Sequence, residues 1–191
     1  RSDSNLIEPS IECALARVTT GEWADALREV FGDYRAATGV EGQVADLDSG
    51  RVDVVRARIE QFESARGRRP RLVVGKPGLD GHSNGAEMIA VAARSAGFDV
   101  VYAGIRMTPE GIVKSAVEED ADLLGVSILS GSHLPIAEAL LAQLRAAGSD
   151  VPVVVGGIVP PEDAEVLCER GVARVFTPSD FELTDIVESM M

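Results

Sequence analysis

The chain has 191 residues, of which 46% are hydrophobic and 26% are charged, a balance that is ordinary for a globular protein. Its formal net charge of −13 argues against nucleic acid or an anionic membrane surface as a partner. No apolar run reaches the roughly 20 residues that a membrane span needs, and no signal peptide is visible, so we expect a cytoplasmic protein.

The first third of the chain predicts helices rather than strands. Residues 5–35 carry apolar side chains at helical spacing and predict two helices, the second of which opens with a capping box of Thr19 and Glu22. Residues 36–50 are rich in turn formers and predict a linker, which a short helix follows. We therefore divide the chain into a helical segment at 1–40, a linker with a short helix at 41–69 and a larger domain at 70–191.

From Pro70 onward, apolar runs and helical patterns alternate. The apolar runs predict five strands, at 71–75, 98–102, 122–127, 151–155 and 172–176. The helical patterns lie near 85–96, 109–119, 134–147, 161–170 and from about 180 onward. This alternation predicts an α/β domain whose five-stranded parallel sheet is covered by helices on both faces. Short right-handed connections favour the flavodoxin-like strand order 2-1-3-4-5.

The most informative segment follows the first of these strands. Residues 76–85 read Lys-Pro-Gly-Leu-Asp-Gly-His-Ser-Asn-Gly and lie at the carboxyl end of a strand, where open α/β sheets bind ligands. Asp80 and His82 are two positions apart, so both side chains project to the same side of an extended loop. A carboxylate can then fix one imidazole nitrogen while the other faces a metal ion. Gly85 lacks a Cβ where the helix begins, which lets a bulky group approach the backbone.

This Asp-x-His-x-x-Gly motif resembles that of cobalamin-binding domains, and two further signatures of that family follow it. Ser127-Ile128-Leu129 matches a Ser-x-Leu signature, and Gly156-Gly157 matches a glycine pair. Each signature comes after its own predicted strand, and the flavodoxin-like order places all three at one edge of the sheet. Three signatures in the family's order are much more specific than the first motif alone.

The resemblance implies a role for each of these residues. His82 is implied to be the lower axial ligand of cobalt, with Asp80 supporting it, and Gly85 to leave room for the nucleotide tail of the cofactor. Ser127 is implied to bond dimethylbenzimidazole, the tail base that His82 displaces from cobalt. The expected cofactor-binding residues are Asp80, Gly81, His82, Ser83, Asn84, Gly85, Ser127, Leu129, Gly156, Gly157 and Thr177, and the metal ligand is His82.

Longer matches select one group within this family. Residues 75–82, 131–135 and 154–163 resemble the acyl-CoA mutases of the methylmalonyl-CoA type, and Ser83-Asn84 with residues 127–135 look closer to the ethylmalonyl-CoA mutases. The segments 5–10 and 19–23 are similar to the stretch that joins the catalytic barrel to the cobalamin domain in such mutases.

The implied function is that of the cobalamin domain of an adenosylcobalamin-dependent radical isomerase, which converts ethylmalonyl-CoA to methylsuccinyl-CoA. The resemblance also implies a catalytic barrel, on the same or on a partner chain, and a homodimer in the full enzyme. The barrel is missing from this chain, so we expect no catalytic residue here. A methylmalonyl-CoA mutase domain, or a cobalamin module that carries methyl groups or acts as a sensor, is the alternative.

Other classes of protein with this topology fit less well. A phosphoreceiver domain requires an acceptor Asp at the end of the third strand, where this chain has Ser127, and a flavodoxin requires a Ser/Thr-rich loop after the first strand. A sensor or methyl-carrying cobalamin module brings a preceding helical bundle, for which residues 5–35 are too short. Spacing does not assign Lys76, while the position of His133 near a helix start favours a structural or phosphate-neighbouring role over metal ligation.

Overall fold

The computed structural model describes residues 5–32, 49–180 and 182–191. The chain divides into two compact units, Arg1–Thr38 and Gly39–Met191. The linker expected at 36–50 lies almost entirely outside the described residues. No helix of the described part combines the length and the apolar character that crossing a membrane requires.

The first unit contains two helices, as predicted: α1 (Ile7–Leu15) and α2 (Thr20–Phe31). The predicted capping box opens α2, since Thr19 Oγ1 accepts from Glu22 N at 3.2 Å and Glu22 Oε2 accepts from Thr19 N at 2.9 Å. Trp23 Nε1 donates to Ser10 Oγ at 3.1 Å and so connects the two helices. Within these two helices no side chain is buried, so their apolar faces lie on the surface of the unit.

The second unit begins with α3 (Ser49–Arg66), an 18-residue helix where a short one was expected. Val55 and Ile59 are buried in the same core cluster as residues of the sheet. Arg51 forms ion pairs with Asp185 and Glu188 near the chain end. This helix is therefore packed onto the larger domain, and it is longer than the short helix that was predicted.

The core of this unit is a five-stranded parallel sheet in the order β2-β1-β3-β4-β5, which confirms the predicted flavodoxin-like topology. The strands are β1 (Arg71–Pro77), β2 (Asp99–Met107), β3 (Leu123–Ile128), β4 (Val153–Gly157) and β5 (Arg174–Phe176). The helices are α4 (Asn84–Ala96), α5 (Pro109–Glu118), α6 (His133–Ala146), α7 (Pro161–Glu169) and α8 (Leu183–Glu188).

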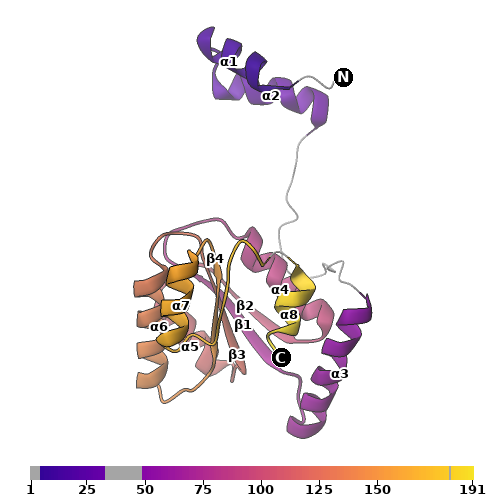
Figure 1. Cartoon of the computed structure of the whole chain (residues 1–191), viewed down its shortest axis with the longest axis vertical. Coiled ribbons are helices and arrows are strands. Elements are labelled where there is room, and N and C mark those ends of the chain that lie inside the picture. The colour runs from indigo at the N-terminus through magenta and orange to yellow at the C-terminus, as the bar shows by residue number, and fades with distance from the viewer. Residues whose placement is uncertain (1–4, 33–48, 181) are drawn as a thin grey trace. The chain divides into compact units, whose positions relative to one another are not determined.

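Helices cover both faces of the sheet (Figure 1). Helices α3, α4 and α8 lie on one side of the strands, and α5, α6 and α7 lie on the other. Alternation along β1 explains the two layers, because Leu72 and Val74 belong to the core under α4 while Val73 belongs to the core under α5. A buried strand in such a sheet must be apolar at every position, which is why the strand candidates read as continuous apolar runs.

Strand β2 differs from its prediction in a way that affects the site. It continues to Met107, well beyond the expected end at residue 102, and its pairing with β1 is interrupted twice by register shifts. Gly104 has a φ of 107° and Arg106 a φ of 57°, both in the left-handed region. The predicted boundary failed because Gly104 and the exposed Arg106 interrupt the apolar run that marked the strand.

Candidate cofactor-binding site

The loop between β1 and α4 holds Asp80 and His82 in contact with each other. Asp80 Oδ1 accepts from His82 N at 3.0 Å and lies 2.5 Å from His82 Nδ1. Because a carboxylate can only accept, this contact places the proton on Nδ1 and leaves a lone pair on Nε2. The side chain of His82 is 85% exposed. The loop therefore presents an oriented imidazole whose free nitrogen is available to a ligand.

Lys76 is the residue of this site whose role the sequence left open. Its side chain is fully buried at the end of β1, and Nζ lies 2.8 Å from Asp80 Oδ2. The Lys76 ammonium, together with the two His82 N–H groups, holds the pKa of Asp80 well below its usual range. Asp80 thus remains ionised at neutral pH and remains an acceptor for the imidazole. The sequence feature that could have identified this role is a lysine at the end of an apolar strand, four residues before Asp80.

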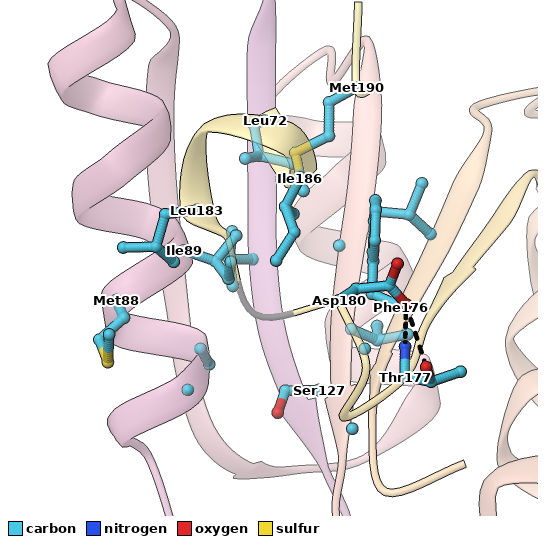
Figure 2. Close-up of a pocket in the computed structure, with 18 of the residues that line it drawn as sticks. Leu72, Met88, Ile89, Ser127, Phe176, Thr177, Asp180, Leu183, Ile186 and Met190 are labelled. Carbon is cyan, nitrogen blue, oxygen red and sulfur yellow. Dashed lines mark hydrogen bonds between the residues drawn. The ribbon is translucent and has the colours of Figure 1, made fainter. Parts of the chain in front are cut away.

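A cavity of about 230 Å³ lies between the sheet and helices α4 and α8 (Figure 2). It is smaller than the roughly 300–1,000 Å³ of a pocket that encloses a whole drug-sized ligand, so it suits one part of a larger molecule. Its walls are mostly apolar, and they include Met88, Ile89, Leu183 and Ile186.

Six of the predicted site residues line this cavity. They come from the start of α4, from the ends of β3, β4 and β5 and from the loops that follow, and they are Gly85, Ser127, Leu129, Gly156, Gly157 and Thr177. The other five, at 80–84, lie on the motif loop and at the start of α4. The structure therefore brings all three sequence signatures to one edge of the sheet.

The glycines of the site differ in what they make possible. A Cβ added to Gly85 meets nothing within 4 Å, and one added to Gly156 comes only within 4.0 Å of Phe176 Cβ. Gly157 has a φ of 147°, and a Cβ there would overlap the carbonyl group of Ile128 on β3. Gly156 and Gly157 are also the last residues of β4, where we expected them to follow the strand. The close approach of β3 therefore requires a glycine at 157, in addition to any role that this residue has toward a ligand.

Asp180 lines the same cavity but was not predicted. Its Oδ2 accepts from Thr177 N at 2.8 Å and from Thr177 Oγ1 at 3.1 Å (Figure 2). These bonds fix the turn that follows β5 and place Thr177 at the cavity wall. The Thr-x-x-Asp spacing of a turn was the signal, but it does not distinguish a cavity wall from any other loop.

His133 lies outside the cavity. It is 4% exposed, and its Nε2 lies 2.7 Å from Asp163 Oδ2, which connects the start of α6 to the start of α7. This contact favours the structural alternative for His133. No group of three or more His, Cys, Asp or Glu side chains in the described ranges is arranged to hold a metal ion.

Comparison with known proteins agrees with this geometry. The model of the B12 binding domain matches residues 70–186. The chain is 55% identical over 188 residues to the ethylmalonyl-CoA mutase of Methylorubrum extorquens, a match that covers 98% of this chain and 27% of that protein. It is 51% identical over 186 residues to the ethylmalonyl-CoA mutase of Cereibacter sphaeroides, with 97% and 28% covered. The chain thus spans about a quarter of the length of these relatives.

A solved structure supports the fold. A cobalamin-binding protein from Desulfitobacterium hafniense superposes with a TM-score of 0.55 at 23% identity, over 73% of this chain and 66% of that one. A likeness at this level of identity shows the shared architecture alone. The family assignment depends on the sequence model, which covers more than half of the chain. The chain belongs to the B12-binding domain family.

Proposed function

We propose that this chain is the cobalamin-binding part of an adenosylcobalamin-dependent acyl-CoA mutase, an isomerase that converts ethylmalonyl-CoA to methylsuccinyl-CoA. One observation carries the proposal: Asp80 orients the imidazole of His82 so that a free Nε2 is exposed near an apolar cavity. The identity to two ethylmalonyl-CoA mutases supports the choice of reaction.

In this proposal His82 Nε2 would ligate the cobalt of the cofactor. A histidine that ligates a metal commonly donates its other N–H to a carboxylate, which fixes the tautomer and raises the basicity of the ligating nitrogen. Asp80 is placed for that task, at 2.5 Å from Nδ1. Lys76 keeps Asp80 ionised and fixed in position through the contact at 2.8 Å. The three side chains form one row from the core of the sheet to the exposed Nε2 of His82, which would hold the metal.

The cavity under α4 would hold the dimethylbenzimidazole base of the cofactor. A flat aromatic group suits these apolar walls, because burial of apolar surface is favourable by about 25 cal/mol per Å². The hydroxyl of Ser127 lines the cavity and can bond a ring nitrogen of the base. Gly85 and Gly156 add no side chain that would fill the space. The residues present therefore fit the tail of a cobalamin.

Adenosylcobalamin supplies a carbon radical through homolysis of its cobalt–carbon bond, while the protein supplies orientation and exclusion of water. In this chain, His82 and the cavity residues hold and orient the cofactor, and we assign none of them to substrate chemistry. A catalytic barrel, on the same or on a partner polypeptide, holds the acyl-CoA. We also propose that the full enzyme is a cytoplasmic homodimer, as the resemblance to acyl-CoA mutases implies.

The experiment that tests His82 is electron paramagnetic resonance of the chain loaded with cob(II)alamin. Histidine labelled with nitrogen-15 should change the superhyperfine pattern of the cobalt signal, because the ligating nitrogen then comes from the protein. His82→Ala should abolish that change, whereas His133→Gln, which alters the other histidine, should retain it. An unlabelled pattern in labelled wild-type protein would show that the base of the cofactor occupies the lower face, and it would reject the proposal.

The substrate is tested with the barrel restored. We expect a higher kcat/KM for ethylmalonyl-CoA than for methylmalonyl-CoA. The reverse order would leave the cobalamin site intact and reassign the enzyme to methylmalonyl-CoA. The chain without a barrel should turn over neither substrate, and measurable turnover would contradict the division of roles.

A further inference from the structure

The end of β2 has an irregular backbone directly beside the motif loop. Gly75 pairs with Gly104 and Pro77 pairs with Met107, so Lys76 alone lies opposite two residues, Ile105 and Arg106. Such a β-bulge bends the strand and changes the direction of a side chain, and bulges are frequent beside functional sites. This bulge lies opposite the lysine that supports Asp80.

Arg106 adopts a backbone conformation that arginine rarely takes. Its φ of 57° lies in the left-handed region, where a side chain of L-chirality crowds the backbone. Of the non-glycine residues that the structure describes in the larger unit, only Asp120 shares this conformation. Strained backbone of this kind persists where the surrounding structure enforces it, and it clusters at ligand sites.

The bulge directs the guanidinium of Arg106 to the motif loop. A Cβ added to Gly81 would lie 3.1 Å from Arg106 Nη2, so the guanidinium lies against the backbone of the residue that precedes His82. The residue is exposed, and no hydrogen bond or ion pair of this guanidinium is found among the described residues. Other arginines of this unit, such as Arg51, Arg68 and Arg71, are in ion pairs with carboxylates.

We propose that Arg106 is a cofactor-binding residue that donates hydrogen bonds to a carboxamide arm on the rim of the corrin. This inference rests on the proposed function, in which His82 ligates the cobalt. A macrocycle held at His82 Nε2 covers the loop beneath it, and the arms on its rim bring amide oxygens to the neighbours of that loop. A guanidinium carries five N–H donors and no acceptor, so it matches such oxygens. The bulge and the strain in β2 are then explained as the means that place this donor.

A corrinoid without a tail isolates this contact. The chain is titrated with aquacobinamide, which retains the corrin and its arms but lacks the nucleotide, and in parallel with hydroxocobalamin. Arg106→Gln should lower the affinity for both corrinoids by a similar factor of about 3- to 10-fold, because both carry the amide arm that loses a hydrogen bond. Equal affinity of wild type and Arg106→Gln for aquacobinamide overturns the inference.

A negative charge added to the ligand tests the same contact, because it should strengthen binding where the loss of Arg106 weakens it. In monocarboxylic acid derivatives of hydroxocobalamin, one amide arm is replaced by a carboxylate. The wild-type chain should bind one of these isomers more tightly than hydroxocobalamin, because a charged acceptor strengthens the bond to a guanidinium. That preference should disappear in Arg106→Gln. A preference that persists in the variant, or that is absent from wild type, rejects a contact between Arg106 and an arm.

The strain provides a readout that a purely structural arginine would not give. Arg106→Gly should raise the Tm of the chain without cofactor, because glycine adopts a positive φ freely. The same variant should still bind aquacobinamide more weakly than wild type does. Asp120→Gly is the control for affinity: it relieves the same strain between α5 and β3, at the amino-terminal edge of the sheet, and also removes an ion pair with Arg68, and it should leave affinity unchanged. Arg106→Gly that raises Tm without loss of affinity would show strain with no role in binding.

Two further outcomes separate this inference from the proposed function. If Arg106→Gln leaves affinity unchanged while His82→Ala reduces it, the Arg106 contact fails and the proposed function stands. If His82→Ala also leaves affinity unchanged, the proposed function fails with it. The Arg106→Gln chain could also bind both corrinoids normally but no longer support turnover with the barrel. That result would indicate that Arg106 pairs with an acidic residue of the barrel and not with a corrin arm, and it would overturn the inference.

Discussion

The Nζ atom of Lys76 lies 2.8 Å from Oδ2 of Asp80, and the lysine side chain is fully buried. A buried ammonium is costly without a counter-charge, so this contact ties the motif loop to the end of β1. The other oxygen of the same carboxylate, Oδ1, holds the ring of His82 at 2.5 Å. The orientation of the exposed imidazole therefore depends on a charge inside the sheet.

The first prediction separates two roles of Asp80, which balances the charge of Lys76 and orients the ring of His82. Asp80→Asn removes the counter-charge of Lys76, so the Tm of the chain without cofactor should fall. Lys76→Met combined with Asp80→Asn removes both charges and should restore most of that Tm, because an apolar side chain can replace a buried ion pair. Cobalamin affinity should remain reduced by about 10- to 100-fold in both variants, since His82 has lost its carboxylate.

Thermal unfolding and absorbance titration measure these two quantities. Asp53→Asn, at an exposed position on α3, is the control for removing a carboxylate and should change neither. If the double variant remains as unstable as Asp80→Asn, the charge of Lys76 is not what the carboxylate balances.

The second prediction concerns acid. The pKa of Asp80 is lowered in the folded state by Lys76 and His82, so folding favours its ionised form. The stabilisation is fully present above the unfolded pKa of about 3.9 and is lost as pH falls from there toward the lower folded value. Urea unfolding of wild type and of Asp80→Asn should therefore differ most above about pH 5, and the difference should shrink steadily as pH falls below about 4. A difference that stays constant down to pH 2 would contradict the role of the ionised carboxylate.

The third prediction compares two glycines of the cavity. Gly85→Ala places its Cβ in open space, so the Tm without cofactor should change little while cobalamin affinity falls. Gly157→Ala pushes a Cβ into the Ile128 carbonyl and adds strain at a φ of 147°, so the chain itself should be destabilised or fail to fold. Gly131→Ala, also in open space but outside the cavity lining, is the control for Gly85. A large loss of Tm in Gly85→Ala would mean that this glycine serves the turn and not the cavity.

The sequence was sufficient to predict the sheet. Buried parallel strands are continuous apolar runs, and Gly97, which ends α4 with a left-handed backbone, shows how local residues mark the helix ends between them. Asp80 and His82 were also predictable, because their contact is made within one loop. Interactions between distant segments were not: the burial of Lys76 and the collision that makes Gly157 necessary depend on strands brought together only by folding.

The end of β2 shows the same limit. Arg106 interrupts the apolar pattern, so periodicity ends the strand before it, although hydrogen bonding with β1 continues to Met107. A bulge is set by the register between two strands, and a single strand's sequence does not contain that information. Asp180 was missed for a related reason, since its turn reaches the cavity only because β5 lies beside β4.

The last prediction tests whether the cavity holds the tail of the cofactor. Ser127 pairs with Gly156 on the neighbouring strand, and its hydroxyl lies at the cavity wall (Figure 2). No hydrogen bond of this hydroxyl is found among the described residues. Ser127→Ala should therefore leave the Tm without cofactor almost unchanged. It should lower the affinity for hydroxocobalamin by about 2- to 10-fold, as expected for one lost hydrogen bond.

Aquacobinamide provides the matching measurement, because it has no base to place in the cavity. Its affinity should be the same in wild type and in Ser127→Ala, in contrast to the effect expected for Arg106→Gln. Ser115→Ala, on α5 at the opposite face of the sheet, should leave both ligands unaffected. Equal weakening of both corrinoids by Ser127→Ala would place this hydroxyl under the corrin, and the cavity would then need another occupant.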